Sequence, residues 1–112
     1  MAYLPKAMVN GVSLTDSAVT YYTVPSSTRG IIKKATFTND SAEVVTVTIN
    51  IVPYEGSVGY ANRIIKEHAI PAGATWSCLD IQNHELETGS FISMLASVTA
   101  TIGCRISGYE VI

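Results

Sequence analysis

Charged residues are scarce in this chain of 112 residues: aspartate, glutamate, lysine and arginine together make up 14%, whereas globular proteins average about 25%. The formal net charge is −2, and the only local basic group is Arg29, Lys33 and Lys34, without interleaved aromatic rings. Nucleic-acid-binding proteins need a larger excess of positive charge. We therefore expect no nucleic-acid partner and interpret the basic group as a solvated strand face. A surface with so little charge repulsion favours contact with other proteins.

Cysteine and histidine are also few, and their spacing excludes the common metal and redox sites. Cys78 and Cys104 are too far apart in sequence for a zinc motif or a redox pair. They are either two buried free thiols, the reading that we favour, or one disulfide. His68 and His84 have no ligand companion at i+2 or i+4. The sequence thus predicts no metal and no cofactor.

A recognisable catalytic signature is missing too. The most polar stretch, residues 80–88, contains Asp80, His84, Glu85 and Glu87. Such side chains could act as acid and base or hold a calcium ion, but their spacing fits no calcium loop, and we interpret the stretch as a solvated loop. There is no nucleophile elbow and no phosphate-binding glycine pattern, and only a pairing of Cys104 with His84 in space is left open. We expect no catalytic residue and no enzymatic activity.

Long apolar runs are absent. None approaches the ~20 residues of a membrane span, and residues 1–10, with Pro5 and Lys6, lack the apolar segment of a signal peptide. We therefore expect synthesis and folding in a cytosol and no membrane partner. The sequon at residues 39–41 is then expected to carry no glycan.

The chain is rich in alternating β-branched and polar residues. Between Glu43 and Pro53, one side of an extended chain carries apolar residues and the other carries polar ones; the apolar set is Val45, Val47, Ile49 and Ile51, and the polar set is Thr46, Thr48 and Asn50. This period of two predicts a strand with one face in a core. We expect it to be the central strand of an all-β domain.

Similar short segments recur about every ten residues between turn residues. Strands are expected at residues 18–24, 31–38, 61–70, 74–79, 90–98 and 101–112, although 61–70 could also form a short helix. Residues 31–38 should form a hairpin with the central strand, and the last two segments should pair with each other. Lys33 interrupts an apolar face, and Gly103 indicates a bulge or a close backbone approach. About eight short antiparallel strands predict a jelly-roll-like β-sandwich.

The N-terminal residues are expected to stand apart from the sandwich. Residues 1–17 are predicted to form an arm with a small hairpin, because Asn10-Gly11 is a strong two-residue turn signal, and residues 18–112 to form the sandwich domain. Plain terminal disorder is the alternative for the arm. The arm places Tyr3, Leu4 and Pro5 where they could contact a partner.

Several aromatic residues are candidates for a binding surface. Tyr54 and Tyr60 flank a glycine-containing loop and suit a protein contact, with packing at the edge of the core as the alternative. Together with Tyr21, Tyr22 and Trp76 they could instead line a sugar-binding face. Trp76 is more simply explained as a core residue with a hydrogen-bonded N–H.

Several segments resemble small virion proteins of tailed bacteriophages. They are residues 20–25 (TYYTVP), 29–32 (RGII), 38–41 (TNDS), 45–53 (VTVTINIVP), 61–65 (ANRII) and 70–73 (IPAG). The likeness covers about residues 18–75, with a looser fit to the end, and in length and strand content the chain resembles the capsid cement, or staple, proteins of podophages.

This resemblance implies a decoration protein that binds the outer capsid surface across neighbouring subunits of the major capsid protein. It brings no catalytic residues. We expect a homodimer or another homo-oligomer located in the virion. A phage tail or baseplate accessory protein and a carbohydrate-binding module are the alternatives.

Overall fold

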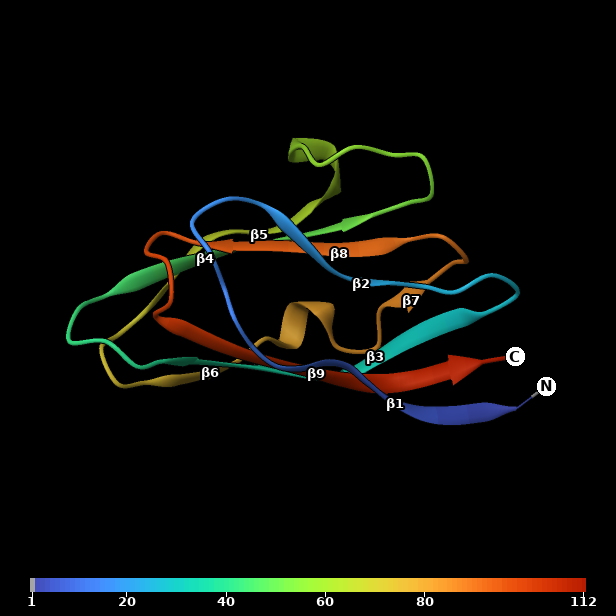
Figure 1. Cartoon of the computed structure of the whole chain (residues 1–112), viewed down its shortest axis with the longest axis horizontal. Helices are drawn as coiled ribbons and strands as arrows, with labels where there is room; N and C mark the ends of the chain where they lie inside the picture. The colour runs from blue at the N-terminus through green and yellow to red at the C-terminus, as the bar shows by residue number, and fades with distance from the viewer. Residues whose placement is uncertain (1) are drawn as a thin grey trace.

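The computed structural model describes residues 2–112, which form nine β-strands and two single turns of 3-10 helix (Figure 1). The strands are β1 (Tyr3–Ser13), β2 (Val19–Thr23), β3 (Arg29–Asn39), β4 (Val45–Val52), β5 (Arg63–Ile70), β6 (Thr75–Ser77), β7 (Glu85–Leu86), β8 (Phe91–Ala96) and β9 (Ile102–Val111), and the turns are η1 (Tyr60–Asn62) and η2 (Leu79–Ile81). No helix in this described range is long and apolar enough to cross a membrane. The predicted all-β class is confirmed, and residues 61–70 are mainly the strand β5.

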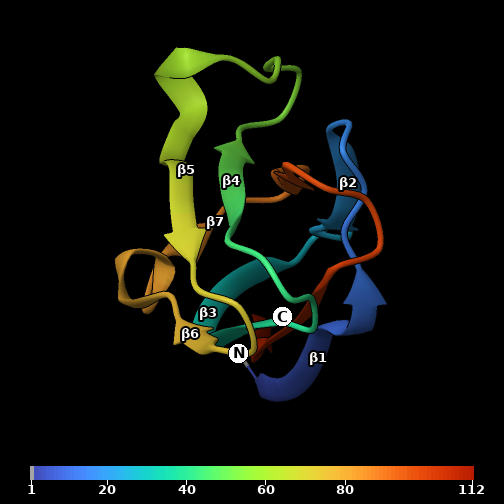
Figure 2. The ribbon, with the colours of Figure 1, turned by 90° about the vertical axis from the view of Figure 1, so that its left-hand side faces the viewer.

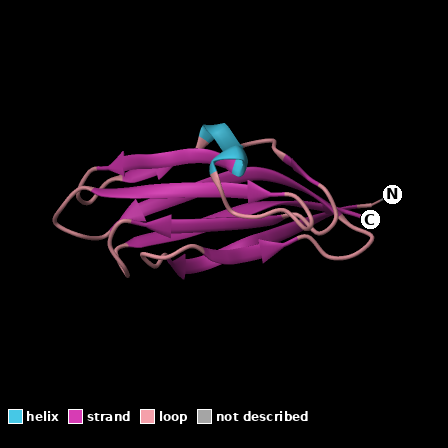
Figure 3. Ribbon diagram, turned by 90° about the horizontal axis from the view of Figure 1, so that it is seen from above, coloured by secondary structure: helices cyan, strands magenta, loops and turns pink. Residues whose placement is uncertain are grey.

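The strands form two antiparallel sheets that pack face to face (Figure 2). One sheet has the order β1-β9-β3-β6, with β7 also paired to β3, and the other has the order β2-β8-β4-β5. The chain alternates between the sheets over its first four strands, and the first and last strands pair with each other. Two four-stranded sheets wound in this way are a jelly roll, to which β7 adds a short ninth strand. The layers are elongated, as Figure 3 shows, and the molecule measures 45 × 26 × 20 Å.

The core lies between the two sheets and follows from the alternation of side chains along each strand. In β9, Ile102, Cys104 and Ile106 are buried, whereas Gly103 and Arg105 are exposed. Side chains of successive strand residues point to opposite faces, so every second residue of β9 enters the core. The largest fully buried side chains include Phe37, Leu14, Ile32, Ile49, Ile70, Ile81, Leu86, Ile92 and Met94.

The predicted central strand is confirmed as β4, which pairs with β5 on one side and β8 on the other. Its apolar face enters the core as expected. Its second face is also buried, because the connection between β4 and β5 folds over it (Figure 1). Asn50 on that face donates from Nδ2 to the carbonyl oxygen of Gly59 at 3.0 Å. A buried amide is thereby satisfied, and the connection is held against the sheet.

The prediction of an N-terminal arm with a small hairpin is wrong. Residues Tyr3–Ser13 form the edge strand β1, which pairs with β9 along its whole length. Asn10 and Gly11 do not turn the chain back; the register shifts between Asn10 and Val12, and Gly11 has φ of +72°. Bulges and tight turns both use positive φ at glycine, so the same dipeptide serves either. Of the expected arm, only Met1 lies outside the described residues.

The two predicted strand pairings are also wrong, because each links strands that lie in different sheets. β3 is followed by β4 in the opposite sheet, and β8 is followed by β9 in the opposite sheet. Asn39 holds the first crossing: its buried Nδ2 donates to the carbonyl oxygens of Glu43 at 2.8 Å and Ile70 at 2.9 Å. These bonds satisfy carbonyl groups at the point where the chain leaves one sheet for the other.

Two irregularities of the sequence have different causes from those expected. Lys33 is the extra residue of a bulge between Ile32 and Lys34, so Ile32 and Ala35 both face the core while Lys33 stays exposed. Gly103 makes neither a bulge nor a close approach, since a Cβ there would meet nothing within 4 Å. The close approach in β9 is at Gly108 instead, where a Cβ would overlap the carbonyl oxygen of Ile31.

Candidate interaction surfaces

The five residues predicted to contact a partner lie on two separate surfaces. Tyr3, Leu4 and Pro5 begin β1 at the edge of one sheet, and Tyr54 and Tyr60 belong to the β4–β5 connection beside the other sheet (Figure 1). All five are exposed, and the four apart from Pro5 range from 44% for Leu4 to 86% for Tyr60. They are therefore available on the chain but do not form one patch.

The surface on β1 presents a tyrosine ring whose position is supported by a neighbour. The rings of Tyr3 and Tyr109 meet edge to face, with centroids 6.5 Å apart, and such contact limits the motion of an exposed ring. The edge of β1 itself is poorly suited to adding a partner's strand, because it carries Pro5, Lys6 and two bulges. The side chains of this strand, not its backbone edge, are what a partner would meet.

The surface on the β4–β5 connection contains one supported and one projecting tyrosine. Tyr54 lies over Gly89, where a Cβ would come within 2.9 Å of the tyrosine side chain. It lines a hollow of about 360 Å³ together with Val24 and Thr88. Tyr60 projects from η1 and is among the most exposed large side chains. Aromatic side chains are enriched at protein contacts, so both exposed rings are candidates for one.

The aromatic residues do not build a sugar-binding platform. Trp76 stacks on His68, with ring centroids 3.8 Å apart and 13° between planes, and packs against Phe37 on its core side. It is half-buried at the edge of the sheet and packs against the core, so the expectation that it fills the core is confirmed only in part. Tyr22 is buried and donates its hydroxyl to a carboxylate oxygen of Glu110 at 2.6 Å. Burial and this carboxylate raise the pKa of Tyr22 above its ordinary value.

The polar stretch 80–88 is a structural connection along β3. It contains η2 and β7, and β7 pairs with Gly30 and Ile31 of β3. Glu87 forms an ion pair with Arg29 at 3.6 Å, with both side chains well exposed. Residues 2–112 contain no group of three metal-ligating side chains. The stretch thus acts here as packing and as surface.

The cysteines are two buried free thiols, as favoured from the sequence. Cys104 pairs with Phe37 of β3, and the N–H of Cys78 donates to Ala35 on the other side of β3. A whole strand therefore separates the two backbones, whereas disulfide geometry requires adjacent ones. Burial raises the pKa of Cys104 to about 12. A thiol protonated at neutral pH and enclosed in the core is a poor nucleophile.

A third surface, which no local sequence pattern predicts, is the outer face of β1, β9 and β3. These adjoining strands carry five of the seven basic residues and, among acidic residues, only Glu110; the five are Lys6, Arg29, Lys33, Lys34 and Arg105. The sequence hides this grouping because the strands come from the start, the middle and the end of the chain. Only the strand order shows that the basic residues share one sheet.

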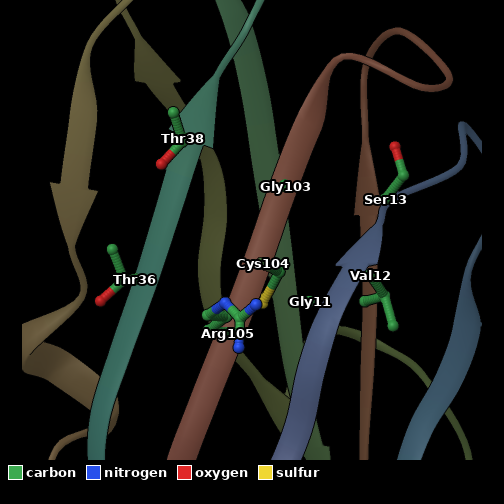
Figure 4. A pocket seen from close by; sticks show the side chains of 8 residues that line it. All are labelled: Gly11, Val12, Ser13, Thr36, Thr38, Gly103, Cys104 and Arg105. Carbon is green, nitrogen blue, oxygen red and sulfur yellow. The ribbon is translucent and has the colours of Figure 1, made fainter.

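Two shallow hollows of about 400 Å³ each lie along the outward side of β9. The first has Gly103 at its floor, Thr36 and Thr38 of β3 on one side, and Val12 and Ser13 of β1 on the other (Figure 4). Arg105 lies across this hollow, and its Nη1 donates to Oδ1 of Asn10 at 2.8 Å. The second hollow is lined by residues of the same three strands, among them Lys6, Lys33, Ser107, Gly108 and Tyr109. We call the two hollows together the β9 trough.

Comparison with known proteins identifies a fold but no family. No protein-family model matches the sequence, and no curated protein matches it significantly. Among solved structures, the chain is similar to a chain in the structure of infectious bursal disease virus, Gx strain, with a TM-score of 0.54 and 11% identity over 97% of this chain. A chain from the Gt strain gives a TM-score of 0.49 and 6% identity over 97% of this chain.

This chain corresponds to only a part of those viral chains. It covers 31% of the Gx chain and 32% of the Gt chain, so it spans about a third of their length. At 11% identity the likeness to the Gx chain establishes a shared fold. A shared fold does not by itself define a function, which depends on the surfaces that the chain presents.

Proposed function

We propose that this chain is a structural protein of a virion, with no enzymatic activity, that assembles with capsid proteins. The observation that carries the proposal is the jelly-roll strand order over nearly the whole chain, matched over 97% of its length by a chain of infectious bursal disease virus. Jelly rolls are also used by lectins and other proteins, so the fold is support only together with the character of the surface.

The surface and the core both favour assembly over catalysis. The polar stretch 80–88 packs along β3, and both thiols are enclosed. The exposed large apolar side chains are numerous for so small a domain: Tyr3, Leu4, Val44, Tyr54, Val58, Tyr60, Leu79 and Val98 are each more than two-fifths exposed. Exposed aromatic and aliphatic side chains on a rigid domain are typical of protein contacts.

The finer proposal is a decoration protein on the outer shell of a bacteriophage capsid. Its support is the resemblance of residues 18–75 to phage virion proteins, and the presence of exposed aromatic side chains beside both sheets. A molecule with two such surfaces can join neighbouring capsid subunits. Many weak contacts on one particle add up through effective concentration. A homodimer would double the number of contacts that each unit makes.

The test is to measure the copy number of this chain in purified particles of the virus that encodes it. We expect mass spectrometry to find it in numbers comparable to the major capsid protein, and particles stripped of it to lose heat resistance and regain it on re-addition. A copy number equal to the symmetry of a single tail would favour the tail or baseplate alternative. Complete absence from particles would refute the virion role.

A further inference from the structure

We propose that the β9 trough is a docking site for an extended, acidic peptide segment of the neighbouring shell protein. The proposal deepens the virion role, on which the identity of the partner rests. The peptide-binding property of the trough itself is independent of that role and is tested separately below.

The first observation is the positive charge of the trough. Lys6, Lys33 and Arg105 line it and are exposed, and none of them forms an ion pair within residues 2–112. Two of them are bound to neutral amide oxygens: Arg105 donates to Asn10, and Nζ of Lys33 donates to Asn83 at 2.8 Å. Such bonds orient a cation without neutralising it, so its charge remains available to a carboxylate.

The second observation is that a glycine, which has no side chain, forms the floor of the trough at its first hollow. Gly103 lies within a central strand, where glycine costs about 0.5–1 kcal/mol of stability relative to alanine. No neighbour requires it, since a Cβ would meet nothing within 4 Å and its φ is not in the left-handed region. Glycine in a strand often marks the close approach of another backbone. On the outward side of Gly103, where a Cβ would lie, no backbone of the described chain approaches, so we infer that the approaching backbone belongs to a partner.

The third observation is a set of hydroxyl groups along the walls. Thr36, Thr38 and Ser13 line the hollow at Gly103 (Figure 4), and among the described residues their hydroxyls have no hydrogen-bond partner. From Gly103 to Tyr109 the trough runs along about 20 Å of strand. Ser13 and Thr38 pair with Gly103, and Thr36 pairs with Arg105, so these free hydroxyls lie at one end of the trough. There they can pair with peptide groups of an extended segment of about six residues that follows the strand.

The same observations disfavour other occupants. Among the described residues that line the trough, Tyr109 is the one aromatic side chain, whereas a base-stacking site uses several rings in succession. A second copy of the chain offers no acidic strand, since its acidic residues outside β5, β7 and β9 lie singly or in a loose pair on connections: Asp16, Asp40, Glu43, Glu55, Asp80 and Glu87. An acidic, extended segment of another protein matches the charge and the shape of the trough.

The binding test uses a fluorescent peptide of alternating glutamate and threonine, about six residues long, and the same peptide with glutamine in place of glutamate. Fluorescence anisotropy with the full chain should show binding of the glutamate peptide, and weakening of that binding when salt shortens the Debye length from about 8 to about 3 Å. The glutamine peptide should bind at least about tenfold more weakly. Equal binding of both peptides would overturn the proposal, and so would preferred binding of a single-stranded oligonucleotide of the same charge.

Matched variants locate the site. Lys6→Glu should weaken glutamate-peptide binding at least about tenfold, whereas Lys66→Glu, an equal charge change on exposed β5, should change it less than about twofold. Gly103→Val should fill the floor and abolish binding while leaving the thermal midpoint unchanged or higher, because a Cβ there has open space. Equal effects of the two lysine variants, or full binding by Gly103→Val, would overturn the proposal.

Particle assays keep the two proposals distinguishable. If the chain is absent from virions but the peptide and variant results hold, the virion role fails and the trough stands. If the chain is present in the shell and Lys6→Glu and Gly103→Val occupy it as the wild type does, the trough is not the docking site and the virion role stands.

Discussion

At the scale of single residues, the two glycines of β9 serve different purposes. Gly108 lies where β9 passes the bulge of β3, and a side chain there would run into the backbone of Ile31. Gly103 lies five residues earlier on the exposed face, with open space around it. One glycine is required by the fold, whereas the other is free to be required by a partner.

The first prediction compares these two positions. Gly108→Ala should lower the free energy of unfolding by at least about 3 kcal/mol, because a backbone carbonyl cannot yield without breaking the pairing of β9 with β3. Gly103→Ala should instead raise it by up to about 1 kcal/mol. Urea unfolding of both variants and the wild type checks this. Equal destabilisation by the two substitutions would contradict the assignment.

The second prediction concerns the buried thiols. Burial raises the pKa of Cys104 from 9.0 to about 12 and also raises that of Cys78. Between pH 9 and about pH 12 the unfolded chain loses thiol protons that the folded chain keeps. The contribution of the thiols to the free energy of unfolding is therefore fully present below pH 9 and declines as the pH rises toward 12. We expect the free energy of unfolding to be at least about 2 kcal/mol lower at about pH 10.5 than at about pH 8.

Urea unfolding at the two pH values measures this loss, and the variant Cys104→Ala is the control. The variant should lose less stability over the same interval, because one of the titrating groups is gone. Tyr22, whose pKa is also raised, would account for part of the remaining loss. The same pH dependence in wild type and variant would show that Cys104 is not the group responsible.

At the scale of strands, alternation predicted where most strands lie but not how they pair. The strands β4 and β5 were predicted at nearly their observed positions because their period of two is uninterrupted by turn residues. The hairpin expected between β3 and β4 is a crossing between sheets, and the deciding bonds of Asn39 reach Ile70, 31 residues away. No local pattern reveals a partner at that distance.

The candidate surfaces also divide into those that local sequence signals predict and one that depends on long-range strand pairing. The exposed tyrosines Tyr54 and Tyr60 were predicted because the flanking glycines and turn residues are local signals. The β9 trough was missed because its walls come from strands joined only by long-range pairing. Basic residues that look unrelated along the chain become neighbours through the strand order.

The third prediction tests the bulge at Lys33. With Lys33 as an extra residue, Ile32 and Ala35 both point inward. Deleting Lys33 leaves a regular alternation and should cost about 1–3 kcal/mol, from the loss of the bend beside Gly108. Deleting Thr36 from the same strand reverses the faces of every residue on one side of it and should prevent folding. Circular dichroism and urea unfolding distinguish the two, and similar losses would contradict the bulge.

At the scale of the whole molecule, β9 joins the two ends of the fold. It lies between β1 and β3 and is paired with both along nearly its full length. The sheet β1-β9-β3-β6 therefore cannot be completed until β9, the last strand of the chain, has paired with both neighbours. Topologies dominated by such non-local pairing fold slowly, in milliseconds to seconds.

The fourth prediction follows from that position. A chain truncated after Thr101 should have no cooperative unfolding transition, because β1 loses its pairing and Ile102, Cys104 and Ile106 leave the core. Thermal unfolding followed by circular dichroism measures this. A truncated chain with a cooperative transition would show that the other strands hold together without β9.

The two described ends of the chain are hydrogen-bonded to each other, with the N–H of Ala2 donating to Ile112 at 2.8 Å and the N–H of Ile112 donating to Ala2 at 3.0 Å (Figure 1). Any polypeptide joined to either end leaves the molecule at one corner. On an assembled particle, an N-terminal tag and a C-terminal tag would therefore emerge side by side, and both would be accessible to antibodies or both would be covered. A pair of single-tag fusions probed with antibodies on intact particles would thus reveal which way each copy is oriented.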